Sequence, residues 1–336
     1  EFIDRLNSGQ KRRLKMGFDP SAPDIHLGHA VGLRKLRQLQ EIGHQVVLIV
    51  GDWTAQIGDP SGRSQTRNML SIEEVHSNAQ TYLDQFFKIV DKERTEIRWQ
   101  SEWFGPFTLT NVIELTSRFT VAQILAREDF AKRFRENQPI SITELLYPLL
   151  QGYDSVAIES DVEFGGTDQK FNLLVGRQLQ QMRGMKAQQC FIMPLLPGTD
   201  GVQKMSKSLG NYIGIDEGPQ EIFGKVMSIP DSLILPYFDW LTDTPTKEIT
   251  EIRNSLESQS VNPIELKKNV AYKLVTDFHN AKSARLSRDF FEKTVQEGQA
   301  PDDIPEYAIP SGDAAAGIKL SNVLVSCGLT SSSGEA

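Results

Sequence analysis

The amino-acid sequence predicts an α/β fold: a doubly wound parallel, Rossmann-like sheet followed by a smaller all-α region. Two observations predict it. Through the first two-thirds of the chain, short apolar runs such as residues 45–50 alternate with helical patterns, as expected for a parallel sheet covered on both faces. Beyond about residue 216 the strand-like runs stop, and helical patterns such as residues 263–280 take over.

The first fifty residues indicate a strand–helix–strand unit. Residues 13–18 (RLKMGF) read as a short strand that Asp19 and Pro20 end. Residues 26–41 read as a helix with regularly spaced apolar positions, and Gly43 lies where a helix-stop residue is expected. Residues 45–50 (QVVLIV) form a continuous apolar run that is typical of a buried parallel strand.

The rest of the chain divides in the same way. A long polar loop is expected at 51–67, and helices at roughly 72–90, 108–118, 120–137 and 141–159. Strands at 161–164 and 190–196 flank a helix at 170–182, and a glycine-containing loop follows at 197–211. We therefore expect a catalytic α/β domain at 1–216 with a helical insertion at about 106–150, an α-helical domain at 217–296, a proline-rich linker at 297–316 and a short final segment at 317–336.

Composition limits the classes of partner. The net charge of −8 provides no general attraction to nucleic acid or anionic membranes, although local basic patches can still bind RNA. No apolar run approaches membrane-spanning length. Two widely separated cysteines, Cys190 and Cys327, favour a reducing compartment over a disulfide scaffold. These features predict a cytoplasmic protein without a membrane partner.

Two histidines mark a candidate phosphate site. His26 and His29 flank Gly28 at the start of the helix that follows the first strand. Helix N-termini at the carboxyl ends of parallel strands favour phosphate, and two imidazoles about one turn apart can donate to its oxygens. Gly28 would let a flat base approach the backbone. Taken alone, an HxxH pattern is better explained by capping or surface histidines, or by an incomplete metal site.

A second basic motif lies in the loop at 201–212. Residues 204–208 (KMSKS) place Lys204, Lys207 and Ser208 in a glycine-flanked segment suited to clamp a triphosphate or departing pyrophosphate. A solvated surface loop is the alternative for this motif alone. Its occurrence together with the histidines and a doubly wound core favours a nucleotide site.

A polar face on the helix at 141–159 suggests an amino-acid pocket. Tyr147, Gln151 and Asp154 are spaced four and three residues apart and so share one helix face. Asp154 can accept a hydrogen bond from a phenolic hydroxyl, while Tyr147 and Gln151 can hold an ammonium group with Asp59 as counter-charge. Core packing explains a lone tyrosine, but an unpaired carboxylate on an apolar helix face is costly to bury.

These motifs resemble those of a known enzyme family. Residues 17–29 (GFDPSAPDIHLGH) and KMSKS resemble the two signatures of class I aminoacyl-tRNA synthetases. Residues 147–154 (YPLLQGYD) and 165–172 (GGTDQKFN) narrow the resemblance to bacterial tyrosyl-tRNA synthetases, from about residue 13 to the end of the chain. Tryptophanyl enzymes share the signatures but not GGTDQ in this form.

The resemblance implies roles for individual residues. Catalytic roles fall on His26, His29, Lys204, Lys207 and Ser208. The tyrosine site would comprise Asp59, Tyr147, Gln151, Asp154 and Lys15. Many relatives have a tyrosine that bonds the substrate hydroxyl where this chain has Lys15, so its role is open. ATP would contact Asp19, Ser21, Gly28, Gly166, Asp168, Gln169, Arg63, Arg67 and Lys207, with Asp168 on the ribose and the arginines near the pyrophosphate.

The implied function is tyrosine–tRNA ligase activity. L-Tyrosine would react with ATP to give tyrosyl-adenylate and pyrophosphate, and the tyrosyl group would pass to the 3′-terminal adenosine of tRNA(Tyr). Mg²⁺ would accompany ATP, with no permanently bound metal. Two alternatives are a synthetase-like RNA-binding protein without aminoacylation and a class I synthetase for tryptophan. Intact signature residues disfavour the first alternative, and the choice of amino acid in an exchange assay tests the second.

The resemblance also implies partners. Residues 120–134 carry more apolar surface than a peripheral insertion needs, namely Val121, Ile124, Leu125, Phe130 and Phe134. Packing within the chain is one explanation, and a homodimer through this region is the one that the family suggests. Residues 317–336 resemble the start of an S4-like RNA-binding domain that is apparently truncated. We accordingly expect amino-acid activation with weakened tRNA charging.

Overall fold

The computed structural model describes all residues except 1, 21–24, 62–69, 300–306 and 309–316. The chain separates into two compact units, Glu1–Arg288 and Asp289–Ala336. The first unit contains the sheet and most of the helices, and it includes both the α/β domain and the helical region expected from the sequence. The boundary expected between them at residue 216 stays a prediction.

Five parallel strands form the sheet, in the order β3-β2-β1-β4-β5. Their bounds are β1 Arg13–Phe18, β2 Gln45–Val50, β3 Thr95–Trp99, β4 Val162–Gly166 and β5 Gln189–Met193. The order reverses between β1 and β4, which is where open parallel sheets bind ligands. The doubly wound fold predicted from the sequence is confirmed.

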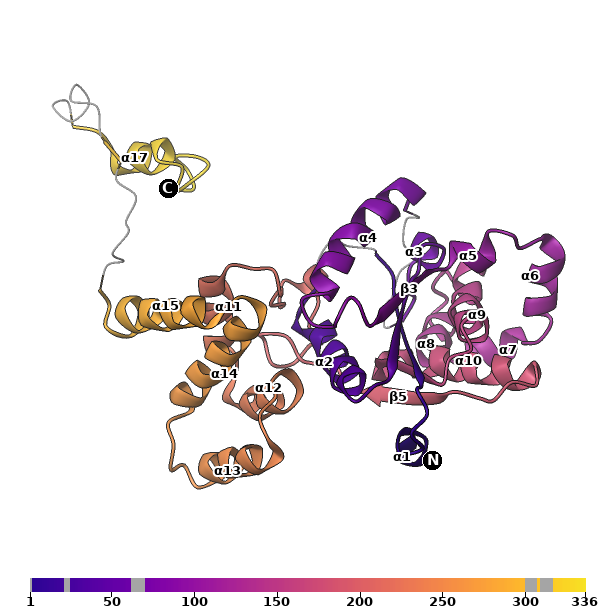
Figure 1. Cartoon of the computed structure of the whole chain (residues 1–336). Coiled ribbons are helices and arrows are strands. Elements are labelled where there is room, and N and C mark those ends of the chain that lie inside the picture. Colours follow the sequence, from indigo (N-terminus) through magenta and orange to yellow (C-terminus); the bar gives the residue numbers. More distant parts are fainter. Residues whose placement is uncertain (1, 21–24, 62–69, 300–306, 309–316) are drawn as a thin grey trace. The chain divides into compact units, whose positions relative to one another are not determined.

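Helices cover both faces of this sheet. Figure 1 shows α2 (Leu27–Glu41) and α4 (Ile72–Phe86) on one face, and α9 (Ile142–Ala157) with α10 (Lys170–Met182) on the other. The strand β2 is therefore buried from Val46 to Val50, as its unbroken apolar run predicts.

Two expectations about individual elements are wrong. The segment predicted as one helix at 120–137 consists of two, α7 (Val121–Leu125) and α8 (Glu128–Arg135), because the backbone of Arg127 is extended between them. The loop expected at 51–67 contains a short helix, α3 (Thr54–Ile57). The edge strand β3 was not predicted.

The insertion between β3 and α9 forms its own small core. It contains α5 (Ser101–Phe104), α6 (Leu109–Thr116), α7 and α8. Buried Ile124 and Phe130 pack with Leu149 of α9 and Leu179 of α10. Packing within the chain therefore accounts for Ile124 and Phe130, two of the apolar residues noted in the sequence.

Past the sheet, the first unit is helical, as predicted. Its helices are α11 Pro219–Met227, α12 Ile234–Leu241, α13 Thr246–Glu257, α14 Pro263–Phe278 and α15 Ala281–Phe291, the last of which crosses into the second unit. Buried Arg34 of α2 contacts this region: its Nη1 lies 2.6 Å from Asp277 Oδ2 and its Nη2 2.9 Å from Asp243 Oδ1. The helix that begins at the paired histidines is thus attached to the helical region.

The second unit contains a short π-helix, Glu292–Gln296, and α17 (Leu320–Ser326). Most of the linker expected at 297–316 lies outside the described residues. The helix α17 lies within the final segment expected at 317–336, whereas the S4-like domain stays a prediction. Within the described part of the chain, no helix is long and apolar enough to cross a membrane.

Candidate active site

A cleft of about 960 Å³ lies at the carboxyl ends of the strands. Its described lining includes thirteen of the site residues predicted from the sequence: Asp19, His26, Gly28, His29, Asp59, Tyr147, Gln151, Asp154, Gly166, Asp168, Gln169, Lys204 and Ser208. Lys15 and Lys207 are described but lie outside this lining. Ser21, Arg63 and Arg67 fall outside the described residues.

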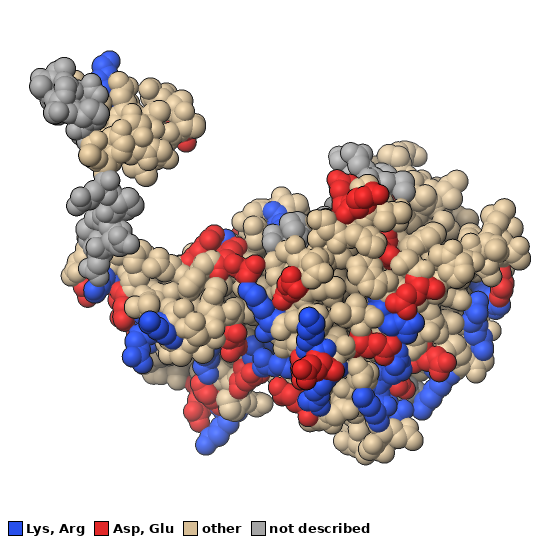
Figure 2. Space-filling model, turned by 45° about the horizontal axis from the view of Figure 1, so that its top comes forward, with Lys and Arg blue, Asp and Glu red and all other residues tan. Residues whose placement is uncertain are grey.

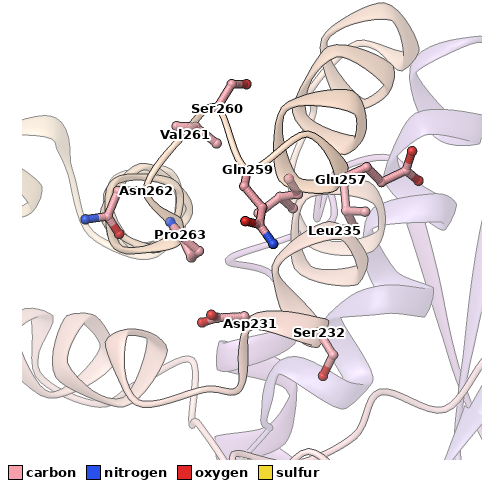
Figure 3. Close-up of a pocket in the computed structure, with 10 residues that line it drawn as sticks. Asp231, Ser232, Leu235, Glu257, Gln259, Ser260, Val261, Asn262 and Pro263 are labelled. Atoms are coloured by element: carbon pink, nitrogen blue, oxygen red, sulfur yellow. The ribbon is translucent and has the colours of Figure 1, made fainter.

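A second cavity, of about 800 Å³, lies in the helical region. Figure 3 shows Asp231 and Ser232 on one side of it and Gln259 to Pro263 on the others. Lys267 Nζ lies 2.6 Å from Asp231 Oδ1 at its edge. The site residues predicted from the sequence line the first cavity and not this one, so we place the active site at the sheet.

His26 and His29 form a hydrogen-bonded start to α2. His26 is the N-cap, and its Nδ1 accepts from the Gly28 N–H at 3.1 Å. The His26 N–H in turn reaches His29 Nδ1 at 3.3 Å, and His29 Nε2 lies 3.1 Å from the hydroxyl of Tyr82. When Nδ1 of a neutral imidazole accepts, Nε2 carries the proton. His26 Nε2–H therefore remains as a donor for a ligand, while His29 Nε2–H donates to Tyr82.

Both imidazoles are held neutral. Burial, followed by repulsion from His29 and from Lys207 and Lys204, lowers the pKa of His26 to about 2. Burial and the charge of Lys207 lower the pKa of His29 to about 4. Each ring thus acts at neutral pH as an uncharged hydrogen-bond donor, and the positive charge beside it comes from the lysines.

Gly28 has a packing reason to be glycine. A Cβ at this position would lie 2.9 Å from the His26 ring and 3.7 Å from Met205 Cβ. A side chain would therefore displace His26 from its capping position. The close approach of a base that the sequence suggested is a second possible use of the same space.

Backbone hydrogen bonds join the histidine segment to residues 213–215, which follow the KMSKS segment. Leu27 N–H donates to the Ile213 carbonyl at 2.9 Å, and Ile215 N–H donates to the Ile25 carbonyl at 3.1 Å. Within the segment, Met205 is buried and its N–H donates to the Leu196 carbonyl. The two signatures, about 180 residues apart in sequence, are thereby fixed side by side.

The lysines of this segment have different partners. Lys204 Nζ lies 3.0 Å from Asp168 Oδ2, so the two residues assigned to phosphate and ribose are paired with one another. Lys207, half-buried in the 3₁₀ turn η2 (Lys207–Leu209), has its Nζ 5.7 Å from the centroid of the Tyr212 ring. Lys204 has to exchange Asp168 for phosphate oxygens if a nucleotide binds.

Gly166 is the last residue of β4 and Gln169 follows shortly after it, and both line the cleft. A Cβ at Gly166 would lie 2.7 Å from Asp168 Oδ1 and from Leu195 Cδ2, so a larger residue would displace these two side chains. Gln169 Nε2 donates to Asp59 Oδ2 at 2.7 Å, and Asp59 Oδ1 accepts from the Ser61 N–H at 2.8 Å. Gln169, assigned to ATP by resemblance, thus contacts the aspartate expected to face an ammonium group.

Tyr147 and Gln151 are held by the neighbouring polar groups. The Tyr147 hydroxyl donates to Asp19 Oδ2 at 2.8 Å, and Asp19 Oδ1 accepts from Thr54 Oγ1 at 2.7 Å. Burial and the charge of Asp19 hold the pKa of Tyr147 well above its usual value. Gln151 Oε1 accepts from Asn172 Nδ2 at 2.9 Å.

Asp154 is a buried carboxylate in the lining of the cleft. It is 1% exposed and accepts from Gln100 Nε2 at 2.9 and 3.1 Å and from Trp103 Nε1 at 3.1 Å. Burial raises its pKa to about 7, against the opposing influence of Lys15 and the Gln100 donor. A carboxylate held by two donors in an apolar wall can still accept a hydroxyl hydrogen bond.

The sequence reasoning missed several residues of this site. Gln100 and Trp103 follow the strand β3, which was itself not predicted, and Tyr82 projects from α4. Their signal is positional, because residues just after a parallel strand meet at the ligand-binding edge. Recognising residues 95–99 as a strand would have pointed to Gln100.

Comparison with known proteins identifies the family. A model of class I tRNA synthetases for tryptophan and tyrosine matches residues 7–296. The tyrosine–tRNA ligase of Dehalococcoides mccartyi strain CBDB1 is 61% identical over 336 residues, all of this chain and 84% of the relative. That of Thermotoga maritima is 50% identical, covering all of this chain and 82% of the relative.

Solved structures share the fold. A C-terminally truncated mitochondrial tyrosyl-tRNA synthetase from Aspergillus nidulans aligns with a TM-score of 0.70 at 20% identity, covering 85% of this chain and 87% of that one. The Archaeoglobus fulgidus tyrosyl-tRNA synthetase complexed with L-tyrosine gives 0.68 at 24%, covering 85% and 93%. Together with the sequence relatives and the geometry of the cleft, these findings show that the chain belongs to the tyrosine–tRNA ligases of the class I tRNA synthetase family.

Proposed function

We propose that the chain activates L-tyrosine with ATP to tyrosyl-adenylate and pyrophosphate, then transfers tyrosine to the 3′-terminal adenosine of tRNA(Tyr). One observation carries the proposal. A single cleft is lined by a buried carboxylate, Asp154, and by two neutral imidazoles together with Lys204. A phenol and a polyphosphate can be held there at once, with the reacting carboxylate and α-phosphate between them.

The amino-acid end recognises each part of tyrosine by chemistry. Asp154 accepts the phenolic hydrogen, and the ammonium group lies near Tyr147, Gln151 and Asp59. A site built to bond a hydroxyl strongly rejects the analogue that lacks it, tyrosyl enzymes being the standard example. Phenylalanine would leave Asp154 buried and without its substrate partner.

The nucleotide end works by positioning and charge. The tyrosine carboxylate attacks the α-phosphate directly, so a protein nucleophile is not required. Lys204, Lys207 and Ser208 face the departing pyrophosphate, and His26 Nε2–H donates to a phosphate oxygen as charge develops there. Asp168 takes the ribose hydroxyls once Lys204 has left it for the phosphates. Ser21, Arg63 and Arg67 are assigned to the same end by resemblance.

Magnesium enters with ATP in this proposal. Among the described residues, no group of three or more His, Cys, Asp or Glu side chains is arranged to hold a metal ion. Mg²⁺ keeps much of its water and is commonly held by substrate phosphates. We therefore assign its coordination to phosphate oxygens and water.

We also propose a homodimer and an RNA partner in the cytoplasm. Large apolar side chains of the insertion and of the start of α9 are exposed by 59–80%, namely Leu109, Ile113, Val121, Phe134 and Ile142. Acidic and basic side chains are intermingled on the face in Figure 2, so tRNA binding would depend on local contacts rather than on net charge. The free cysteines Cys190 and Cys327 suit a reducing compartment.

Tyrosine-dependent ATP–pyrophosphate exchange, run with each of the twenty amino acids, tests the activity. We expect exchange with tyrosine and little with phenylalanine or tryptophan. Lys207→Ala and His29→Ala should each lower kcat by about tenfold or more, because the first removes a charge beside the departing pyrophosphate and the second removes the ring that holds His26 in place. Lys247→Ala and His76→Ala, which alter exposed residues outside the cleft lining, should leave the rate unchanged. Exchange at the parent rate in the first two variants would contradict the mechanism.

A further inference from the structure

Lys15 is a fully buried lysine behind the amino-acid end of the cleft. The register of β1 and β4 places it opposite Glu163. Its Nζ lies 2.8 Å from Glu163 Oε1, and the two side chains are 0% and 2% exposed. A buried ammonium group is costly unless a counter-charge and hydrogen bonds compensate it. The buried Lys15–Glu163 pair is therefore stable only if the surrounding polar groups form hydrogen bonds with both side chains.

The hydrogen bonds of Lys15 use its full donor capacity. An ammonium group has three N–H donors. Glu163 Oε1, Ser155 Oγ at 2.8 Å and the Gln151 carbonyl at 2.9 Å match those three. Lys15 cannot donate to a substrate without giving up one of these partners. Direct contact with tyrosine, the role suggested by resemblance, is therefore not the role that its geometry favours.

The helix that carries the substrate-facing residues is attached to this group. Two of the three acceptors of Lys15, Gln151 and Ser155, belong to α9 and flank Asp154. Ser155 Oγ also donates to Glu163 Oε2 at 3.0 Å, and Gln188 Nε2 donates to the same oxygen. Movement of Lys15 would thus be transmitted to the part of α9 that lines the cleft.

Asp154 lies within electrostatic range of the pair. Lys15 Nζ is 4.0 Å from Asp154 Oδ2, too long for a hydrogen bond but short for two charges in a buried site. The polar groups around Asp154 come from several elements: Lys15 from β1, Glu163 from β4, Gln100 after β3 and Trp103 from α5. One ammonium group therefore serves two buried carboxylates.

We propose that Lys15, with Glu163 as its counter-ion, is a positioning residue that does not touch the substrate. It keeps Asp154 ionised, so that Asp154 can accept the hydrogen bond of the substrate hydroxyl. This inference rests on the proposed function. The carboxylate form fits its surroundings, because Gln100 Nε2 and Trp103 Nε1 both donate to it. A protonated Asp154 would instead bring a donor of its own. The positive charge of Lys15 favours the ionised form of Asp154, and the negative charge of Glu163 partly opposes this effect.

The direction of each influence makes the proposal testable. Burial raises the pKa of Asp154 to about 7, the charge of Lys15 lowers that pKa and the charge of Glu163 raises it. Asp154 therefore changes its charge close to neutral pH. The histidines of the cleft, with pKa values of about 2 and 4, titrate well below this range. A change in tyrosine recognition between pH 6 and 8 is thus assigned to Asp154.

The experiment measures KM for tyrosine, KM for ATP and kcat in the exchange reaction from pH 5.5 to 8.5, using the full chain. The variants are Lys15→Met, Glu163→Gln and the double variant. For the parent we expect KM for tyrosine to rise below about pH 7. Asp154→Asn should remove this pH dependence and so assign it.

The two single variants should move the midpoint of the pH dependence of KM for tyrosine in opposite directions. Lys15→Met should raise the midpoint by about one pH unit or more, so that KM for tyrosine increases about fivefold or more at pH 7 and recovers toward pH 8.5. Glu163→Gln should lower it. The double variant, which removes one charge of each sign, should stay close to the parent. KM for ATP should change by less than about twofold throughout.

A purely structural role gives a different pattern. It predicts losses that are independent of pH and have the same sign in both single variants, and that result would overturn the proposal. If Lys15→Met does not fold, Glu163→Gln and the double variant test the proposal instead. An unmoved or raised midpoint of the pH dependence in Glu163→Gln would also overturn it. A parent chain without tyrosine-dependent exchange would instead refute the proposed function.

Discussion

Single residues in this cleft depend on their surroundings for their charge. His26 and His29 share a burial that removes their charge, whereas Asp154 is buried and partly compensated by Lys15 and two neutral donors. The histidines are therefore donors at neutral pH, whereas Asp154 changes between its protonated form and its ionised, acceptor-only form close to pH 7. The residue type determines which protonation states each side chain can adopt, and the neighbouring groups determine which of these states is populated.

The shifted pKa of His29 predicts a pH-dependent stability. Its pKa is about 4 in the folded chain against 6.5 for an ordinary histidine. The unfolded state therefore binds the extra proton first, and this contribution is present above pH 6.5 and is lost as the pH falls toward 4. His29→Gln should remove that loss, about 1–2 kcal/mol between pH 7.5 and pH 5.

Urea unfolding of parent and variant at pH 7.5, 6 and 5 checks this. Asp154 acts in the opposite direction, because its raised pKa makes the folded state gain stability as the pH falls below about 7. Comparison of variant with parent isolates His29, since Asp154 is common to both. Parallel curves for the two proteins at all three pH values would contradict the prediction.

At the scale of elements, the close contact of α9 with α10 positions the amino-acid pocket. A Cβ at Gly152 of α9 would lie 2.9 Å from Val175 Cγ1 and 3.0 Å from the Gly176 backbone nitrogen. Gly176 is equally confined, with Ser155 Oγ 2.9 Å from its added Cβ. Two glycines thus let two helices approach over the Lys15–Glu163 pair.

Gly152→Ala should destabilise the chain by about 1–3 kcal/mol, because a backbone atom cannot move aside for the new methyl group. The matched control is Gly224→Ala in α11, where nothing lies within 4 Å of the added Cβ. There the same substitution should stabilise by about 0.4–1 kcal/mol through the unfolded state. Chemical unfolding measures both, and equal effects at the two positions would show that helix propensity alone decides.

At the scale of the whole molecule, the insertion presents apolar surface beyond what its own core uses. Phe130 is 0% exposed and Ile124 is 4% exposed, while Val121 and Phe134 are 62% and 63% exposed. Single exposed apolar residues are ordinary, but contiguous ones mark interaction surfaces. The four residues come from two adjacent short helices, which is why one run of sequence contributes to a core and to a surface.

Sedimentation tests whether this surface joins two copies. We expect a dimer for the parent chain at micromolar concentration, and at least about tenfold weaker association for Phe134→Asp, because a charge in an apolar interface has no partner. Leu286→Asp, at an exposed apolar position of α15, is the control and should remain dimeric. A monomeric parent, or equal association in both variants, would count against the dimer.

Much of the fold could be predicted because its signals are local. The bounds of β1, β2 and α10 agree with expectation to the residue, since continuous apolar runs and amphipathic periodicity are written along the chain. The strand β3 was missed because it is an edge strand: Glu96 and Arg98 alternate with half-buried residues and interrupt the apolar run. Gln100 and Trp103 were missed along with it.

The sequence by itself determined the fold class, the family resemblance and most of the cleft residues, because short motifs and periodic patterns carry them. Only the tertiary structure decided which groups meet across long separations. The register of β1 against β4 pairs Lys15 with Glu163, and the packing of α9 sets Asp154 beside them. Charge states follow from these contacts, because burial and neighbouring charges act through space and not along the chain.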